Sequence, residues 1–227
     1  MAKPAKIVQK TVVINRAIPG SGKTTLSRCL KETLENRGLT VSVHSTDDYF
    51  LTETGAYQFE IHKLAENHIK NMQAFRQAID RGTYLVICDN TNLSPWETEP
   101  YATYARAHRY QIIMIDYAPR DLAQHLAVQQ VTEENVAAHN IPARDLSEML
   151  KRYHQYHKYL NRLRPVDNNG GPAFTWSNEL QTMVPTDEPI KNYDYDHLLT
   201  VQPNQYRRAK REIPRQILAL MTTGKAE

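Results

Sequence analysis

The sequence predicts an α/β fold in which a parallel sheet is covered by helices on both faces. Over the first 160 residues, short apolar runs rich in β-branched residues alternate with longer helical patterns, which is typical of strands joined by crossover helices. The run Tyr84–Cys88 has no polar alternation, so we expect a strand buried on both sides. The length of 227 residues and the hydrophobic content of 41% suit one α/β domain with an appendage, and they exclude a disordered or fibrous protein.

Four strands and five helices are expected in this first part of the chain. The strands are Val8–Ile14, Leu39–His44, Tyr84–Cys88 and Gln111–Asp116. The helices are Thr25–Arg37, Glu60–Arg81, Trp96–His108, Leu122–Gln130 and Ala143–Leu160. Gly38 and Gly82 follow the first two helices directly, where a glycine commonly ends a helix.

The composition changes after residue 162. The stretch Arg164–Pro172, RPVDNNGGP, is typical of a turn or linker. We therefore predict a main domain over residues 1–162 and a C-terminal extension over residues 163–227. Within the extension, weak strand patterns occur at Phe174–Trp176 and Leu198–Val201, and a short basic helix is expected near the end.

The formal charge of +3 is unevenly placed. Residues 205–227 carry six Lys or Arg and two Glu, a net of +4, which leaves the rest of the chain at −1. This distribution argues against a protein that coats nucleic acid with a wholly positive surface. A local anion-binding role for the basic end remains open.

The sequence lacks a membrane span, a secretory signal and a disulfide framework, and we therefore expect a cytoplasmic protein. The apolar runs are at most five residues long, whereas a helix needs roughly 20 to span a bilayer, so no membrane partner is expected. The N-terminus is polar and has no secretory signal pattern. The two cysteines, Cys29 and Cys88, lie in apolar segments and do not form a disulfide framework.

A Walker A pattern follows the first expected strand. Residues 17–24 read AIPGSGKT, with Ala17 at a position where glycine is commoner. The glycines allow successive backbone N–H groups to face a phosphate, and the N-terminus of the next helix adds a favourable field. Lys23 is expected to reach the β- and γ-phosphates, and the Thr24 hydroxyl to bind Mg²⁺. The predicted nucleotide-binding residues are Pro19, Gly20, Ser21, Gly22, Lys23, Thr24 and Thr25.

Acidic residues follow the second and third strands. In a parallel sheet these strand ends line the ligand crevice. After the second strand, Asp47 or Asp48 is placed to accept a proton from an attacking hydroxyl; a turn or helix cap is the alternative use of these residues. After the third strand, Asp89 is a candidate Mg²⁺ ligand, and Thr91 and Asn92 are candidates for substrate binding.

These motifs together resemble the P-loop kinases related to polynucleotide 5′-hydroxyl kinase, in particular small kinases with GSGKT, DDYF and DNTN motifs. The similar stretches are RAIPGSGKTTL, STDDYF, GAYQF, His68-x-x-Asn71 and ICDNTNLSPWETEPY, with a weaker one from His139 to Tyr153. They span about 140 residues in the same order as in that family, whereas the chain after residue 162 resembles nothing known to us.

The resemblance implies a parallel sheet of about five strands and an enzyme that transfers the γ-phosphate of ATP to an alcohol group. The acceptor would be the 5′-OH of a nucleic acid or nucleotide, with ATP and Mg²⁺ required. Carried over to this sequence, Asp47 would be the general base, with Lys23 as the phosphate-binding catalytic residue. Asp48 would be structural or bind substrate.

One stretch departs from the family. Its members usually carry arginines on a lid helix that contact the transferring phosphoryl group, and such cations accelerate transfer by orders of magnitude. Here neither Arg nor Lys occurs between Arg120 and Arg144. Arg120, Arg144 or the basic end, with Arg207, Arg208, Lys210 and Arg211, are the candidates to replace them.

Two further functions therefore stay open. The first is a zeta-toxin-like kinase of a nucleotide-sugar or small metabolite, which the nearly neutral body of the chain favours over a groove for long nucleic acid. The second is a catalytically weak nucleotide-binding switch or interaction module, which the missing lid arginines favour.

Overall fold

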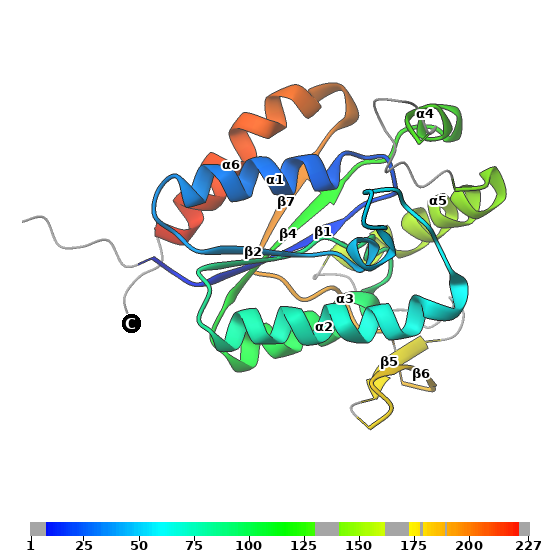
Figure 1. Cartoon of the computed structure of the whole chain (residues 1–227), viewed down its shortest axis with the longest axis horizontal. Helices are drawn as coiled ribbons and strands as arrows, with labels where there is room; N and C mark the ends of the chain where they lie inside the picture. The colour runs from blue at the N-terminus through cyan, green and yellow to red at the C-terminus, as the bar shows by residue number, and fades with distance from the viewer. Residues whose placement is uncertain (1–7, 130–140, 162–172, 178, 189, 223–227) are drawn as a thin grey trace, which may run out of the picture.

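A computed structural model describes residues 8–129, 141–161, 173–177, 179–188 and 190–222. Five parallel strands form the central sheet in the order β2-β3-β1-β4-β7 (Figure 1). Their bounds are Thr11–Arg16 for β1, Val41–His44 for β2, Leu85–Cys88 for β3, Gln111–Tyr117 for β4 and His197–Val201 for β7. The predicted parallel sheet of about five strands is confirmed, and all four strands expected in the first part of the chain are present within a few residues.

Helices cover both faces of this sheet, as predicted (Figure 1). Helix α1 (Lys23–Glu35) and helix α6 (Tyr206–Thr222) pack on one face, and α2 (Leu64–Asp80) and α3 (Pro95–Ala107) on the other. Two further helices, α4 (Leu122–Val128) and α5 (Ala143–His157), lie towards one end of the sheet. The short turns are η1 (Thr46–Phe50), η2 (Ile61–Lys63), η3 (Lys158–Leu160) and η4 (Pro203–Gln205), and strands β5 (Ala173–Ser177) and β6 (Thr182–Thr186) form a separate antiparallel hairpin.

Side chains that alternate in direction along the central strands divide the hydrophobic core into two layers, one on each face of the sheet. On β1, Val12 and Ile14 pack in the cluster with α2 and α3, whereas Val13 packs in the cluster with α1 and α6. Successive side chains of a strand point to opposite faces, and each face here is covered, so both sets are apolar. The strands therefore read as continuous hydrophobic runs in the sequence.

The predicted domain boundary at residue 162 requires a correction. Strand β7 pairs in parallel with β4, with Ile113 opposite His197 and Tyr117 opposite Val201. Helix α6 buries one face against α1, mainly through Ile213, Ile217 and Met221. These residues of the expected extension are thus part of the core, because β4 would otherwise be an uncovered edge. The predicted linker, Arg164–Pro172, lies outside the described residues.

Two other observations bear on the sequence expectations. Among the described helices, none has the length and apolar character needed to cross a membrane. Cys29 and Cys88 are both free thiols, one half-buried and one buried. Burial raises the pKa of the Cys88 thiol to about 12, so it remains protonated at neutral pH.

Candidate functional site

The predicted phosphate loop lies between β1 and α1. Gly20 and Gly22 have positive φ angles of 79° and 88°, a conformation that glycine adopts without steric cost. The first turn of α1 has neither an acidic residue nor a side-chain cap, so its N–H groups are available to an anion. The Ser21 hydroxyl, also in this loop, is buried and has no hydrogen-bond partner among the described residues. The loop therefore has the geometry of a phosphate site.

Two helices pack closely over the glycines of the loop. A Cβ atom on Gly20 would lie 2.7 Å from Val128 Cγ2 of α4, and one on Gly22 would lie 2.5 Å from the Tyr206 ring of α6. Such distances are shorter than side chains tolerate. Both glycines are thus needed for close approach as well as for their backbone angles.

Lys23 is a buried cation surrounded by carboxylates. Its Nζ lies 3.7 Å from Asp47 Oδ2, and only 8% of its side chain is exposed. Burial alone would lower the pKa of Lys23, but the charges of Asp89, Asp47 and Asp48 outweigh it and raise that pKa above its ordinary value. Lys23 is therefore firmly protonated, and one ammonium faces three acidic side chains. The excess negative charge favours a further cation at this site.

Asp89 has one carboxylate oxygen that no protein group satisfies. Its Oδ1 accepts hydrogen bonds from Asn15 Nδ2 at 2.6 Å and Ser27 Oγ at 3.2 Å. The Asp89 side chain is fully buried, and its Oδ2 has no hydrogen-bond partner among the described residues. A buried, unpartnered carboxylate oxygen is costly in an empty pocket and suits a metal ion. The predicted metal ligand therefore fits a divalent cation.

Asp47 and Asp48 lie in the turn η1, directly after β2. Ser45 caps this turn by accepting from the Asp47 backbone N–H at 3.3 Å. The Asp47 carboxylate is one-third exposed and accepts from the Tyr57 hydroxyl at 3.4 Å. Burial and the charges of Asp89 and Asp47 raise the pKa of Asp48. The charges of both acids therefore act on Lys23, although the resemblance to the family implied a general-base role for Asp47 alone.

The segment after β3, residues 90–92, is hydrogen-bonded to the residues at the ends of β1 and β2. Asn90 Oδ1 accepts from the Thr46 backbone N–H at 2.9 Å. Asn92 has a φ of 49° and donates through Nδ2 to the Asn15 carbonyl oxygen at 2.7 Å. The Thr91 carbonyl accepts from the Ala17 N–H at 2.8 Å. These bonds give Thr91 and Asn92 a structural use at this edge, and their predicted role in substrate binding stays a prediction.

Of the two arginine candidates predicted outside the basic end, Arg120 is at the loop. Its Nη1 donates to the Gly20 carbonyl oxygen at 2.7 Å. Arg144 lies exposed in the first turn of α5. The lid stretch that lacks arginines falls largely on residues 130–140, which lie outside the described residues. Arg120 is therefore the candidate cation whose contact with the phosphate loop is observed.

His125 is a loop contact that the sequence reasoning missed. The side chain is fully buried in α4; its Nε2 accepts from the Arg120 backbone N–H at 3.0 Å, and Nδ1 lies 3.0 Å from the Pro19 carbonyl oxygen. Since Nε2 accepts, the proton must be on Nδ1, which donates to Pro19. Burial lowers the pKa of His125, consistent with this neutral form. No motif in the sequence marks such a contact, because it depends on how α4 packs.

Tyr206 is a second missed residue. Its hydroxyl donates to the Gly22 carbonyl oxygen at 2.6 Å, so the basic end of the chain begins at the phosphate loop. Along the same helix, Lys210 Nζ lies 5.7 Å from the centre of the Tyr206 ring, and Arg208 pairs with Glu212 at 2.6 Å. The sequence predicted a basic helix here without placing it.

A buried ion pair supports the start of the loop. The fully buried Arg16 contacts Asp116 Oδ1 through Nη1 at 2.8 Å and donates through Nη2 to the Tyr153 carbonyl at 2.6 Å. The Tyr153 hydroxyl in turn donates to Asp116 at 2.8 Å, and Tyr193 accepts from Arg16 Nε at 2.9 Å. This network joins β1, β4, α5 and the segment before β7 just below the phosphate loop.

Within the described ranges, no three His, Cys, Asp or Glu side chains gather as a metal cluster. A magnesium ion at a phosphate loop uses only one or two side chains, with phosphate oxygens and water as its other ligands. A cluster of three is therefore not the arrangement to expect at this site.

Comparison with known proteins places these features in a family. Residues 12–156 match the AAA_33 family, described as an AAA domain. Human NEDD4-binding protein 2 is 30% identical over 154 residues, which are 68% of this chain; the chain spans only 8% of that protein's length. A solved structure of a putative kinase from Chloroflexus aurantiacus is similar with a TM-score of 0.55 and 14% identity, covering 96% of this chain and 100% of that one. Shikimate kinase from Acinetobacter baumannii is more distant, with a TM-score of 0.47 and 16% identity over 98% of this chain and 97% of that one.

The match and the structure agree on the part of the chain that carries the site. Residues 12–156 run from β1 through the phosphate loop and into α5, and they make up well over half of the sequence. We conclude that this chain belongs to the AAA_33 family and has the fold of P-loop kinases.

Proposed function

We propose that this chain is a kinase that uses ATP and Mg²⁺ to phosphorylate a hydroxyl, with the 5′-OH of a nucleic acid or nucleotide as acceptor. The observation that carries this proposal is the gathering of Lys23, Asp47 and Asp89 beside the phosphate loop. A loop that only binds nucleotide does not need a one-third exposed carboxylate next to its lysine. Such a carboxylate is what a hydroxyl acceptor requires.

In the proposed reaction, Asp47 accepts the proton of the acceptor hydroxyl as its oxygen attacks the γ-phosphorus. The new P–O bond forms as the bond from the γ-phosphorus to the bridging oxygen breaks, and ADP leaves. Lys23 contacts the β- and γ-phosphates, and Arg120 contributes a cation beside Gly20. The Thr24 hydroxyl and the unpartnered Asp89 Oδ2 would hold Mg²⁺, which supplies neutralisation of phosphate charge.

Transfer of labelled γ-phosphate tests this proposal. The protein is incubated with γ-labelled ATP and Mg²⁺, together with a 5′-OH oligonucleotide, a nucleoside, a sugar or no acceptor. We expect label on the oligonucleotide or nucleoside, lost in Asp47→Asn. Asp187→Asn, the same change at an exposed carboxylate after β6, serves as the matched control and should retain transfer. ATP binding without transfer to any acceptor would contradict the proposal and favour a nucleotide-binding switch.

A further inference from the structure

A cavity of about 590 Å³ lies between α2, α3 and the β5–β6 hairpin. Figure 1 shows the hairpin on the α2 and α3 side of the sheet, away from α1 and α6. The segment after β3 also lines it, through Asn90, Thr91 and Asn92. Sites for small ligands are typically of this size and are lined mainly by apolar and aromatic side chains with a few polar groups.

Aromatic side chains from distant parts of the chain form the cavity's outer wall. Trp96 comes from α3, whereas Phe174 and Trp176 come from β5. Phe174 and Trp176 are two residues apart on one strand and therefore share a face of the hairpin. Trp176 is paired across the hairpin with Met183, which lines the same cavity, and the rings of Trp96 and Phe174 are 5.6 Å apart.

One polar atom in this wall has no partner among the residues that the structure describes. The Nε1 of Trp176 is buried and makes no hydrogen bond to a described residue. An indole N–H normally finds an acceptor when it is buried. A ligand that is flat and carries ring nitrogens or carbonyl oxygens would supply both a stacking partner and the missing acceptor.

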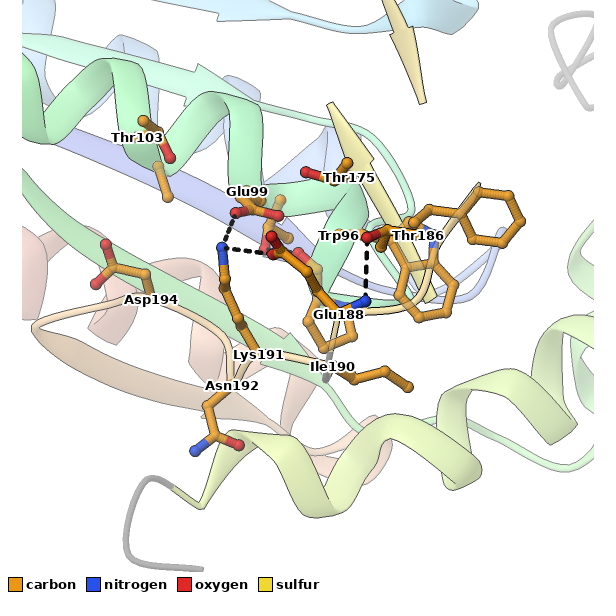
Figure 2. A pocket seen from close by; sticks show the side chains of 14 residues that line it. Trp96, Glu99, Thr103, Thr175, Thr186, Glu188, Ile190, Lys191, Asn192 and Asp194 are labelled. Carbon is orange, nitrogen blue, oxygen red and sulfur yellow. Dashed lines mark hydrogen bonds and ion pairs between the residues drawn. The ribbon is translucent and has the colours of Figure 1, made fainter. Parts of the chain in front are cut away.

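The hairpin is anchored so that this wall has a defined position. A second cavity, of about 190 Å³, shares Trp96 and Phe174 with the larger one, and Figure 2 shows the residues that line it. In it, Lys191 Nζ lies 3.1 Å from Glu99 Oε1 of α3 and 3.9 Å from Glu188 Oε2 (Figure 2). The Lys191–Glu99 pair thus connects the chain after β6 to α3, and Asp194, which also lines this cavity, pairs with Arg106 of α3.

The large cavity adjoins the proposed proton acceptor. His68 lines the cavity and hydrogen-bonds through Nδ1 with Thr46 Oγ1 at 3.1 Å. Asn90 lines it as well and accepts from the Thr46 backbone N–H. Thr46 directly precedes Asp47. Asp47 does not itself line the cavity, but its charge acts on the lining residue His68, so the cavity lies close to the proposed general base.

The charges around the cavity indicate which part of a ligand it suits. Arg152 is the one Lys or Arg among the residues that line it, and its Nη2 is bonded to Glu97 Oε1 at 2.6 Å and Ser94 Oγ at 3.1 Å. A pocket for phosphates would present several uncompensated cations. This one suits an uncharged planar ring.

We propose that this cavity binds the heteroaromatic ring of the acceptor, the nucleobase of the nucleoside whose hydroxyl is phosphorylated, and that the β5–β6 hairpin provides this specificity. The assignment rests on the proposed kinase function. It selects a base-bearing acceptor over a plain sugar, and it gives the hairpin, which follows the part of the chain that matches the family, a role at the site.

Intrinsic fluorescence gives a direct binding test without ATP. The chain has two tryptophans, Trp96 and Trp176, and both line this cavity. A 5′-OH trinucleotide is titrated against the wild-type protein, alongside a matched trinucleotide whose 5′-terminal nucleotide is abasic. We expect saturable quenching by the first probe and weak or no quenching by the second. Equal quenching by both probes, or none by either, would overturn the cavity assignment.

Kinetics separate this inference from the kinase proposal. In Trp176→Leu we expect the KM for the base-bearing trinucleotide to rise about tenfold or more, because the base loses an aromatic ring on which it stacks. The KM for ATP should not change. Thr175→Ala, on the opposite face of the same strand, is the matched control.

If Trp176→Leu is poorly folded, the wild-type protein still tests the inference through its KM values for base-bearing and abasic trinucleotides. Transfer with the same KM for base-bearing and abasic ends would overturn the cavity assignment and leave the kinase proposal standing. Selective quenching by the base-bearing probe without transfer to any hydroxyl would support base binding and overturn the kinase proposal.

Discussion

The hydroxyl of Tyr206 donates a 2.6 Å hydrogen bond to the carbonyl oxygen of Gly22, which joins the last helix of the chain to the phosphate loop. The Tyr206 ring also fills the space where a Cβ atom on Gly22 would lie. The loop is therefore supported by a residue 184 positions away, and its shape depends on α6 being in place.

We expect Tyr206→Phe to weaken nucleotide binding more than it weakens the fold. The change removes one half-buried hydrogen bond, which costs about 1 kcal/mol of unfolding free energy, while the Gly22 carbonyl keeps the hydrogen bond that it accepts from the Leu26 backbone N–H at 3.1 Å. Urea unfolding and the dissociation constant for ATP measure the two effects. Tyr84→Phe, at an exposed tyrosine before β3, is the matched control. An unchanged affinity for ATP would show that the hydrogen bond does not hold the loop in its binding shape.

Removal of the basic end should unfold the protein rather than only reduce its positive charge. Ile213, Ile217 and Met221 of α6 are buried against α1, and full burial of such a side chain contributes about 1.5–3 kcal/mol. A chain that ends at Asn204 should therefore lose its cooperative thermal transition, whereas one that ends at Thr222 should keep it. Retention of the transition in the shorter chain would mean that α6 is dispensable for the core.

The basic charge itself is tested separately by substitution. Arg207 and Arg211 are exposed on α6, so replacing both with Gln should leave the fold intact. Unchanged phosphoryl transfer in that variant would exclude these two residues as replacements for the lid arginines. A loss of transfer with normal stability would support the sequence-based suggestion that the basic end supplies a cation.

Much of the fold and site could be predicted because the signals are local. The loop from Ala17 to Thr24, the acids Asp47 and Asp89, and the apolar strands all follow from patterns within short windows. Strand β7 was harder to recognise as part of the sheet. It lies at the sheet edge, and its burial alternates, with Leu198 partly exposed and Val201 buried. A short alternating strand far from its partner in sequence has no local feature that assigns it to β4.

The buried polar contacts could not be predicted for a related reason. Arg16 precedes the phosphate loop, where a charged residue is normally taken as exposed, yet it is fully buried against Asp116. Its burial is tolerable because Tyr153, Tyr193 and Asp116 occupy its donors. These partners are 100 or more residues away in sequence. Tertiary packing, rather than local pattern, determines such networks.

Stability should fall as the pH decreases below 6.5. The His44 ring lies edge-on to Phe75 and is hydrogen-bonded to the Ser42 hydroxyl at 2.7 Å. Burial in this position lowers the pKa of His44 to about 4. Between pH 6.5 and 4 the unfolded chain binds a proton at this residue and the folded chain does not, so stability present above pH 6.5 is lost as the pH falls. The loss from this residue alone approaches about 3 kcal/mol at pH 4.

A non-titrating side chain at position 44 isolates this effect. Urea unfolding from pH 7 to pH 4.5 should show a shallower pH dependence in His44→Gln than in the wild type. His62→Gln removes a highly exposed histidine instead and should leave the slope unchanged. If His44→Gln had the wild-type slope, the pH dependence would come from His68 and His125, whose pKa values are also lowered by desolvation.

Lys23→Ala should abolish phosphoryl transfer and weaken ATP binding by orders of magnitude. The substitution removes the buried ammonium beside Asp47, Asp48 and Asp89, so the phosphates of ATP would meet three carboxylates with much less positive charge to offset them. The same excess of negative charge should make the variant's residual ATP affinity more dependent on Mg²⁺ than that of the wild type. Lys31→Ala, at an exposed lysine of the same helix paired with Glu35, is the matched control. Isothermal titration with ATP at several Mg²⁺ concentrations measures both effects, and circular dichroism checks the fold. Wild-type ATP affinity in a folded Lys23→Ala protein would refute the assignment of this loop as the nucleotide site.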